Sequence, residues 1–334
     1  RYQHGIMCDN YTLNKNRLLK ASLTGRVINS FGDVSLEVGS KFYANLGTAQ
    51  SGQMGSVAGI YTIGNLEIDG ADVKINALLD FKKEVEEEIS VVVSTIESMG
   101  EELSIIDSNV EISVLQYNDD FDIPDATCSA TAVAGIDGTF VKTSGSRIKI
   151  EIDGDYINEA RAINSHGFSA TNSSLDLKVG GKTAGGIECY ALLPTEVAPV
   201  TFENTNATID LHNYLLDSST DIILLPFDDT GILGTSLSFI SSGENTISIN
   251  TNGGATLCVR TGTAEQPVKP HDGYTGNHLT FDNVSYESSK TFCYNEESYT
   301  GSYGYTFVIE SLYENLGSGN YKHIDNLIIT YSAK

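Results

Sequence analysis

Short runs of alternating apolar and polar residues, each ended by glycine, asparagine or aspartate, recur along most of this 334-residue chain. In DVSLEV, Val34 and Leu36 fall on one side, and in SRIKIEID the residues Ile148, Ile150 and Ile152 do the same. A period of two is typical of a β-strand with one buried face. The 32 glycines and 17 tyrosines agree with this pattern, because glycine supplies turns with positive φ and aromatic side chains suit a pleated sheet.

The pattern predicts a mainly β protein of one or two antiparallel β-sandwich or jelly-roll domains, with hairpins such as NLEIDGADVKI turning at Asp69-Gly70. A domain boundary is expected where Pro194 and Pro199 follow a glycine-rich stretch. No repeat with a fixed period of about 20–50 residues is apparent, which disfavours a solenoid or a propeller. The predicted units are an extended arm at 1–26, a first β domain at 27–193 and a second β domain at 200–334.

Residues 85–110 fit two different structures. Apolar residues recur there with 4-3 spacing, which is typical of an amphipathic helix or coiled coil, and a helical insert would lie within 77–106. The β-branched run Val91-Val92-Val93 and Gly100 favour instead a hairpin of ISVVVSTIES and LSIIDSNVEISVLQY, turning at residues 99–102. Both alternatives stay open at this point.

Charge and hydropathy limit the function classes. The net charge of −24 argues against nucleic acid as the main partner, because phosphate binding needs a basic surface. No apolar run of about 18 residues is present, so no transmembrane segment is expected. The N-terminal residues lack the apolar core of a signal peptide and begin with Arg1, which we interpret as the result of cleavage after export. An extracellular or cell-surface location follows, with a virion as the alternative.

The first 26 residues differ electrically from the rest of the chain. They contain five Lys or Arg and one Asp, whereas the remainder contains 15 Lys or Arg and 43 Asp or Glu. Opposite charges on arm and body would favour head-to-tail contacts between copies, and ASLTGRVI alternates enough to add a strand to an open sheet edge. The residues predicted to carry this assembly arm are Arg1, Lys15, Arg17, Lys20, Leu23, Arg26 and Val27.

No catalytic signature is present, since Gly-x-Ser-x-Gly, His-Glu-x-x-His and P-loop spacings are all absent. We therefore expect a structural protein and not an enzyme: the subunit of an extracellular homopolymer, such as a pilus-like filament, docked by strand addition from the arm. The alternatives are a virion structural protein of a capsid or tail, and a glycan-binding adhesive β-sandwich. A carbohydrate-active enzyme is the third class.

Three further sets of residues are candidates for covalent or metal chemistry, and no other cofactor is expected. Asn118, Asp120 and Asp122 alternate as in the first half of an EF-hand calcium loop, although Ile123 replaces the required glycine. Widely spaced cysteines suggest disulfides between strands or, equally, reduced thiols, and Asn-x-Ser/Thr sequons suggest glycosylation. The disulfide candidates are Cys258 with Cys293 and Cys128 with Cys189, and the glycosylation candidates are Asn10, Asn172, Asn206 and Asn283.

Overall fold

Strands make up nearly all of the chain for which the structure, a computed structural model, gives a description. The described residues are 3–47, 55–80, 89–117, 128–190, 198–214, 230–234, 236–240, 242–251, 255–260, 279–280, 284–286, 295–300, 306–310, 313–317, 320–323 and 326–332. Within them, no helix is long and apolar enough to cross a membrane.

The strands fall into two large sheets, called A and B here. Sheet A contains β1 (Gln3–Cys8), β2 (Tyr11–Leu13), β4 (Val34–Leu36), β6 (Gly55–Thr62), β7 (Leu66–Asp69), β9 (Ile89–Ser98), β10 (Leu103–Ile106), β12 (Cys128–Ser144), β14 (Ile157–Thr171), β16 (Thr183–Cys189), β17 (Pro199–Glu203), β19 (Thr230–Gly234), β20 (Ser236–Ile240), β22 (Ala255–Arg260), β23 (Leu279–Thr280), β25 (Asn295–Thr300) and β26 (Thr306–Glu310). Sheet B contains β5 (Lys41–Gly47), β8 (Asp72–Asp80), β11 (Asn109–Tyr117), β13 (Arg147–Asp153), β15 (Ser174–Gly181), β18 (Asn206–Asn213), β21 (Glu244–Thr251), β24 (Val284–Tyr286) and β29 (Asn326–Ser332). Strand β3 (Leu18–Ser30) contributes its first half to sheet B and its second half to sheet A, and β27 (Tyr313–Gly317) pairs with β28 (Asn320–His323) separately.

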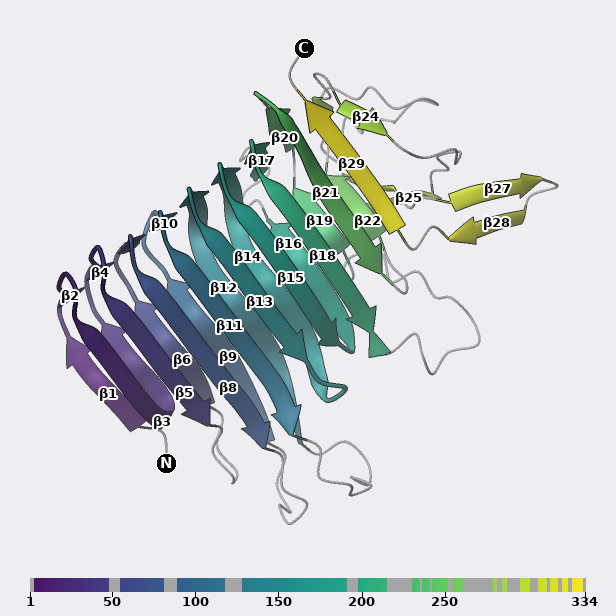
Figure 1. Cartoon of the computed structure of the whole chain (residues 1–334). Helices are drawn as coiled ribbons and strands as arrows, with labels where there is room; N and C mark the ends of the chain where they lie inside the picture. The colour runs from purple at the N-terminus through teal and green to yellow at the C-terminus, as the bar shows by residue number, and fades with distance from the viewer. Residues whose placement is uncertain are drawn as a thin grey trace.

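From β5 to β18, each strand of sheet B pairs with the sheet B strands that come before and after it along the chain, and these pairs are parallel. Strand β8, for example, lies between β5 and β11, with Ile75 opposite Ala44 on one side and Ile112 on the other. Sheet A follows the same rule, since β12 lies between β9 and β14. The chain therefore winds as a parallel β-helix, in which each coil lies on the previous one (Figure 1).

The mainly β prediction is confirmed, but the predicted antiparallel sandwich or jelly roll is wrong. Among the described strands, antiparallel pairing occurs only towards the C-terminus, in the pairs β21–β29, β22–β26, β24–β29, β25–β26 and β27–β28. Alternation of apolar and polar residues has the same period in parallel and antiparallel strands, so it carries no information on strand direction. The supposed hairpin turn at Asp69-Gly70 is a corner of the coil, where the chain passes from sheet A to sheet B.

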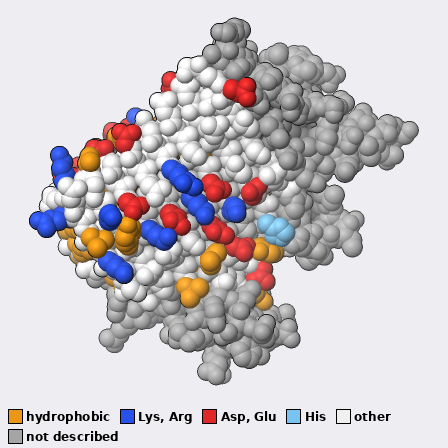
Figure 2. Space-filling model, viewed as in Figure 1, with side chains coloured by type: hydrophobic (Ala, Val, Ile, Leu, Met, Phe, Trp, Pro, Cys, Tyr) orange, Lys and Arg blue, Asp and Glu red, His pale blue; other side chains and the backbone are white. Residues whose placement is uncertain are grey.

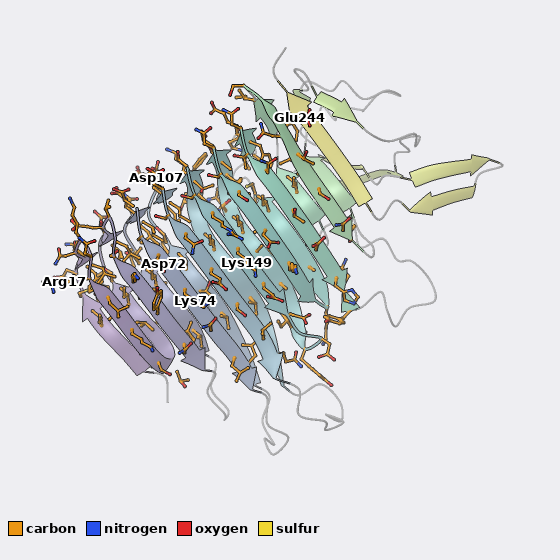
Figure 3. The ribbon with its side chains drawn as sticks, in the orientation of Figure 1. Arg17, Asp72, Lys74, Asp107, Lys149 and Glu244 are labelled. Carbon is orange, nitrogen blue, oxygen red and sulfur yellow. The ribbon has the colours of Figure 1, made fainter. Side chains whose placement is uncertain are left out.

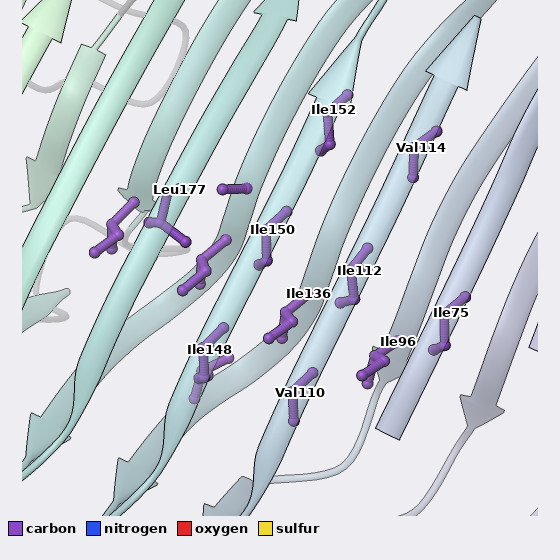
Figure 4. Packing of buried hydrophobic residues seen from close by; sticks show 14 of the residues in the cluster. Ile75, Ile96, Val110, Ile112, Val114, Ile136, Ile148, Ile150, Ile152 and Leu177 are labelled. Atoms are coloured by element: carbon purple, nitrogen blue, oxygen red, sulfur yellow. The ribbon is translucent and has the colours of Figure 1, made fainter. Parts of the chain in front are cut away.

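Alternate side chains of sheet B stack inside the coil as continuous columns. One column runs through Ile75, Ile112, Ile150 and Leu177, all of them buried, and Figure 4 shows these residues aligned across neighbouring strands. Full burial of such a side chain stabilises the fold by about 1.5–3 kcal/mol. These four strands therefore contribute a continuous aliphatic ladder to the core, and Phe168, Phe202 and Phe239 form an aromatic one further along the stack.

The corners leading into sheet B recur in every coil from the first to the seventh, but at unequal intervals along the sequence. At each of these corners one residue has positive φ: Asn16, Gly39, Gly70, Asp107, Gly145, Asn172 and Asn204. Glycine, asparagine and aspartate tolerate this left-handed conformation better than other residues do. The chain segments between coils differ in length, from residues 81–88 and 118–127 to Lys182 alone, so the corners do not recur at a fixed interval. The absence of a fixed period therefore does not exclude a solenoid.

A buried hydroxyl ladder follows the same corners. The backbone N–H of Ala71 donates to Ser108 Oγ (3.0 Å), the N–H of Ser108 to Ser146 Oγ (3.0 Å), and the N–H of Ser146 to Ser173 Oγ (3.2 Å). Ser173 N–H in turn donates to Thr205 Oγ1 (3.2 Å). Each buried corner N–H thus finds an acceptor one coil further on, which avoids a desolvation penalty of about 1–3 kcal/mol per group.

Of the two alternatives for residues 85–110, the helix is wrong in the described ranges, whereas the hairpin is right about the strands but wrong about their pairing. Strands β8, β9 and β10 occupy 72–80, 89–98 and 103–106, and residues 81–88 lie outside the described residues. Strands β9 and β10 do not form a hairpin, because each pairs with strands of other coils. The 4-3 series does not mark one face, since Ile96, Leu103 and Val110 are buried whereas Val92, Met99 and Ile106 are exposed.

The predicted divisions of the chain also differ from the fold. Residues 3–26 are not an extended arm, because they form β1, β2 and most of β3 and pair with the next coil. Strands β17 and β18 pair with β14 and β15, so the sheets continue across the boundary expected at Pro194 and Pro199.

Candidate assembly edge and surface groove

The first coil of the helix is formed by β1, β2 and the first half of β3. Strand β1 pairs with the second half of β3, β2 with β4, and residues 18–24 with β5. Among the described strands these are the only partners of the first coil, so one backbone edge of each strand faces away from the stack. Figure 1 shows β1 at the outer end of the stack, beside the N-terminus.

The core columns reach the surface at this end. Leu19, Ala21 and Leu23 point inward like their partners in β5, yet they are only partly buried. Their partners Phe42, Ala44 and Leu46 have exposed fractions of 0, 1 and 3%. The difference arises because, among the described strands, the first coil has a neighbour on one side only. An end with unpaired strand edges and a half-exposed core is favourable for strand addition.

The predicted arm residues divide into two groups in the structure. Lys15, Arg17 and Lys20 are exposed on the first coil, and Figure 3 shows Arg17 at this end. Arg26 instead lies on the outer face of sheet A, where its guanidinium stacks 3.5 Å from the Tyr61 ring centroid and donates to Asn29 Oδ1 (3.2 Å) and Ser56 Oγ (3.1 Å). Leu23 belongs to the half-exposed core end, Val27 is buried, and Arg1 lies outside the described residues.

The opposite end of the parallel stack is different. Strand β29 runs antiparallel along β21 from Glu244 to Asn250, and β26 runs antiparallel along β22. In Figure 1, β29 lies across the C-terminal side of sheet B. The strand direction therefore changes where the described stack ends at the C-terminal side, whereas no described strand covers β1 on its outer side.

The outer face of sheet B is flat and has mixed charge. Figure 2 shows Lys and Arg interspersed with Asp and Glu there, and Figure 3 labels Asp72, Lys74 and Lys149 on this face. Lys74 and Glu111 form an ion pair at 3.1 Å, and both side chains are about half exposed. Such exposed pairs contribute little to stability.

The outer face of sheet A carries a register row of polar residues on successive strands: Asn29, Tyr61, Glu97, Asp137, Asn164 and Glu188. At its far end Glu188 is fully buried and pairs with Arg161, which also binds Glu159 Oε2 at 2.7 Å. Tyr190 donates its hydroxyl to Glu188 Oε2 at 2.5 Å. Burial opposes ionisation of Arg161, but the Glu188 carboxylate outweighs it and raises the pKa of the guanidinium, so the pair is charged.

Glu97 and Asp137 are adjacent in this row and affect the pH dependence of stability. Burial, together with the charge of Asp137, raises the pKa of Glu97, and burial raises the pKa of Asp137 despite a hydrogen bond from Asn164 Nδ2 (3.3 Å). A carboxyl whose pKa is higher in the folded state stabilises that state when protonated. This contribution is complete below the ordinary pKa of 3.8 for Asp and is lost as pH rises through the raised value.

Asp137→Asn is therefore expected to raise the midpoint of thermal unfolding at pH 7. The advantage over the wild type should shrink as pH falls and vanish below the ordinary carboxyl range. Differential scanning fluorimetry over a range of pH values measures the difference in unfolding midpoint between this variant and the wild type. Asp176→Asn, on the outer face of sheet B, is the control. An advantage that is the same at all pH values would show that charge burial is not the cause.

A groove of about 800 Å³ lies on a third side of the coil. This side is formed by the sheet A strands β4, β7 and β10 and by the end of β12. The labels β2, β4 and β10 mark this side in Figure 1. Ser35, Glu67, Ser104 and Lys142 are in register across the four strands and line the groove. Sequence reasoning missed it, because these residues come from four coils and are separated by 32 or more positions.

The remaining predicted sites are only partly described. Asn10 and Asn206 hold corners, since their Oδ1 atoms accept from the N–H groups of Asp33 and Thr246 at 2.8 Å, and Asn172 is a positive-φ corner. Asn283 and the calcium candidates Asn118, Asp120 and Asp122 lie outside the described residues. In the described ranges, no three His, Cys, Asp or Glu side chains converge as a metal site.

The structure does not support the suggested Cys128–Cys189 disulfide. Cys189 is a buried free thiol 3.2 Å from Ser165 Oγ, and burial raises its pKa to about 12. Cys128 begins β12, ten residues before Gly138, which is in register with Ser165 and so with Cys189. Ten residues of strand span about 33 Å, too far for the suggested Cys128–Cys189 disulfide. Cys293 lies outside the described residues, so its pairing with Cys258 stays a prediction.

No family model, curated protein or solved structure matches the chain significantly.

Proposed function

We propose that this chain is the structural subunit of an extracellular homopolymer, in which the first coil docks end-on against a second copy by strand addition. The observation that carries the proposal is the N-terminal end of the stack, where unpaired strand edges surround a half-exposed core at Leu19, Ala21 and Leu23. Docking would pair these edges and complete the burial of the core columns. Both effects favour association.

Charge supports a head-to-tail contact over a contact between two first coils. Lys15, Arg17 and Lys20 make the first coil basic, whereas the rest of the chain has a large excess of acidic residues. Two first coils would repel each other, and a basic coil would be attracted to an acidic part of the next copy. A head-to-tail contact repeats without closing and forms a filament or a similar surface assembly.

Sedimentation velocity of the purified chain over a concentration series tests this proposal. We expect species larger than the monomer to grow with concentration, and to decline as salt rises from about 0.05 M to about 0.5 M, because salt screens exposed charges beyond a few ångströms. Lys149→Glu changes the net charge on the flat outer face of sheet B, away from the first coil. It is the control for an effect of net charge alone. A chain that stays monomeric at all concentrations would overturn the proposal.

A further inference from the structure

The groove along β4, β7, β10 and β12 has the size and shape of a binding site for an extended ligand. Its volume of about 800 Å³ lies within the range of small-molecule sites, about 300–1,000 Å³. Parallel strands lie about 4.8 Å apart, so the groove presents a new set of side chains at each such step. This step is close to the length of one pyranose unit in an extended glycan.

The polar groups of the groove are held in place by a ladder across the coils. The N–H of Asp33 donates to Asn10 Oδ1 (2.8 Å), the N–H of Asn65 to Asp33 Oδ1 (2.9 Å), and the N–H of Glu102 to Asn65 Oδ1 (3.1 Å). Asp33, Asn65 and Glu102 all line the groove. The side chains of Asp33 and Asn65, whose oxygens accept in this ladder, are therefore held before any ligand arrives, which lowers the entropy cost of binding. The Glu102 carboxylate is held separately, by hydrogen bonds from Ser104 and Lys142.

The charge of the groove selects among ligands. Asp33, Glu67, Glu101 and Glu102 line it together with one cation, Lys142, which pairs with Glu102. Hydrogen bonds from Lys142 and Ser104 lower the pKa of Glu102, so this carboxylate stays ionised at neutral pH. The lining has an excess of negative charge and would repel uronate or sialylated chains, whereas hydroxyl groups can donate to its carboxylates.

An aromatic ring completes the lining. Phe140 is half-buried and lines the groove, and Lys142 Nζ lies 5.5 Å from its ring centroid. The ring gives an apolar surface beside the hydroxyl and carboxylate groups of Ser35, Glu67 and Ser104. Ligand sites typically combine apolar or aromatic walls with a few fixed polar groups.

We infer that this groove binds a short stretch of an extended neutral glycan, whose hydroxyl groups bond to the in-register column while a sugar face packs on Phe140. The site lies on the side of the coil, so it is independent of end-on docking. A polymer of such subunits would present one glycan site per copy, and many weak sites on one polymer would give high avidity.

An array of defined neutral, amino-sugar and uronate oligosaccharides, followed by calorimetric titration of the best neutral hit, tests this inference. Glu67→Lys and Phe140→Ala should each weaken binding of that neutral oligosaccharide at least about tenfold, the equivalent of about 1.4 kcal/mol. Glu151→Lys on sheet B is the matched control and should bind like the wild type. The absence of any neutral hit, binding of uronate chains alone, or unchanged binding by both groove variants would each overturn the inference.

Discussion

Replacing Leu19 and Leu23 together by lysine is expected to abolish end-on association while leaving a folded monomer. Both side chains end core columns and are half-exposed in the single subunit, so the lysine ammonium groups can reach water there. Docking would bury them. An uncompensated buried charge costs at least about 3 kcal/mol, which corresponds to about a hundredfold weaker association.

The matched control for this prediction is Leu18→Lys/Ser22→Lys, which adds the same two charges to the same strand but on its exposed outer side. Sedimentation velocity compares the three proteins, and circular dichroism confirms that each is folded. Larger species that persist unchanged in the Leu19→Lys/Leu23→Lys protein would place the contact elsewhere on the molecule.

Arg161→Met is expected to cause the largest loss of stability among substitutions of polar residues. Arg161 has 17% of its side chain exposed and its partner Glu188 has none. Methionine would fill much of the same space but remove the guanidinium, so a buried carboxylate would lose its counter-charge. Removal of one partner from a buried ion pair costs about 3–5 kcal/mol.

A double-mutant cycle distinguishes this electrostatic effect from a packing effect. Arg161→Met/Glu188→Gln should recover much of the stability lost in Arg161→Met, because the second substitution removes the buried charge. Arg147→Met, at the exposed start of β13, is the control and should change stability by less than about 0.5 kcal/mol. Urea denaturation measures the wild type, Arg161→Met, Glu188→Gln, the double variant and Arg147→Met. A loss below about 1 kcal/mol for Arg161→Met would mean that water reaches Glu188.

The sequence allows the strands to be predicted but not their arrangement. The alternation of Ile148, Ile150 and Ile152 correctly marks a strand with one buried face. The partners of that strand lie in β11 and β15, and no local signal indicates that pairing is parallel and one coil away. Chain segments of unequal length between coils hide the repeat, although asparagine, aspartate or glycine before a serine or threonine recurs at corners such as Asp107-Ser108 and Gly145-Ser146.

The basic character of the first 26 residues could be recognised from the sequence, but its structural meaning could not. The lack of a clear hydrophobic period predicts an extended arm, whereas the segment forms the first coil. Its alternation is weak because an end coil buries its inner side chains only partly. The groove could not be predicted from the sequence for a different reason. The stacking of four coils is what brings together Ser35, Glu67, Ser104 and Lys142.

Hydrogen–deuterium exchange of the wild-type chain at low and high concentration tests end-on docking by the first coil most directly. Docking by strand addition predicts that backbone amides in residues 3–8 and 18–24 exchange more slowly at high concentration, while those of β8 and β11, inside the stack, exchange at the same rate in both samples. Protection confined to another part of the surface, or no concentration dependence in the first coil, would contradict the proposed assembly.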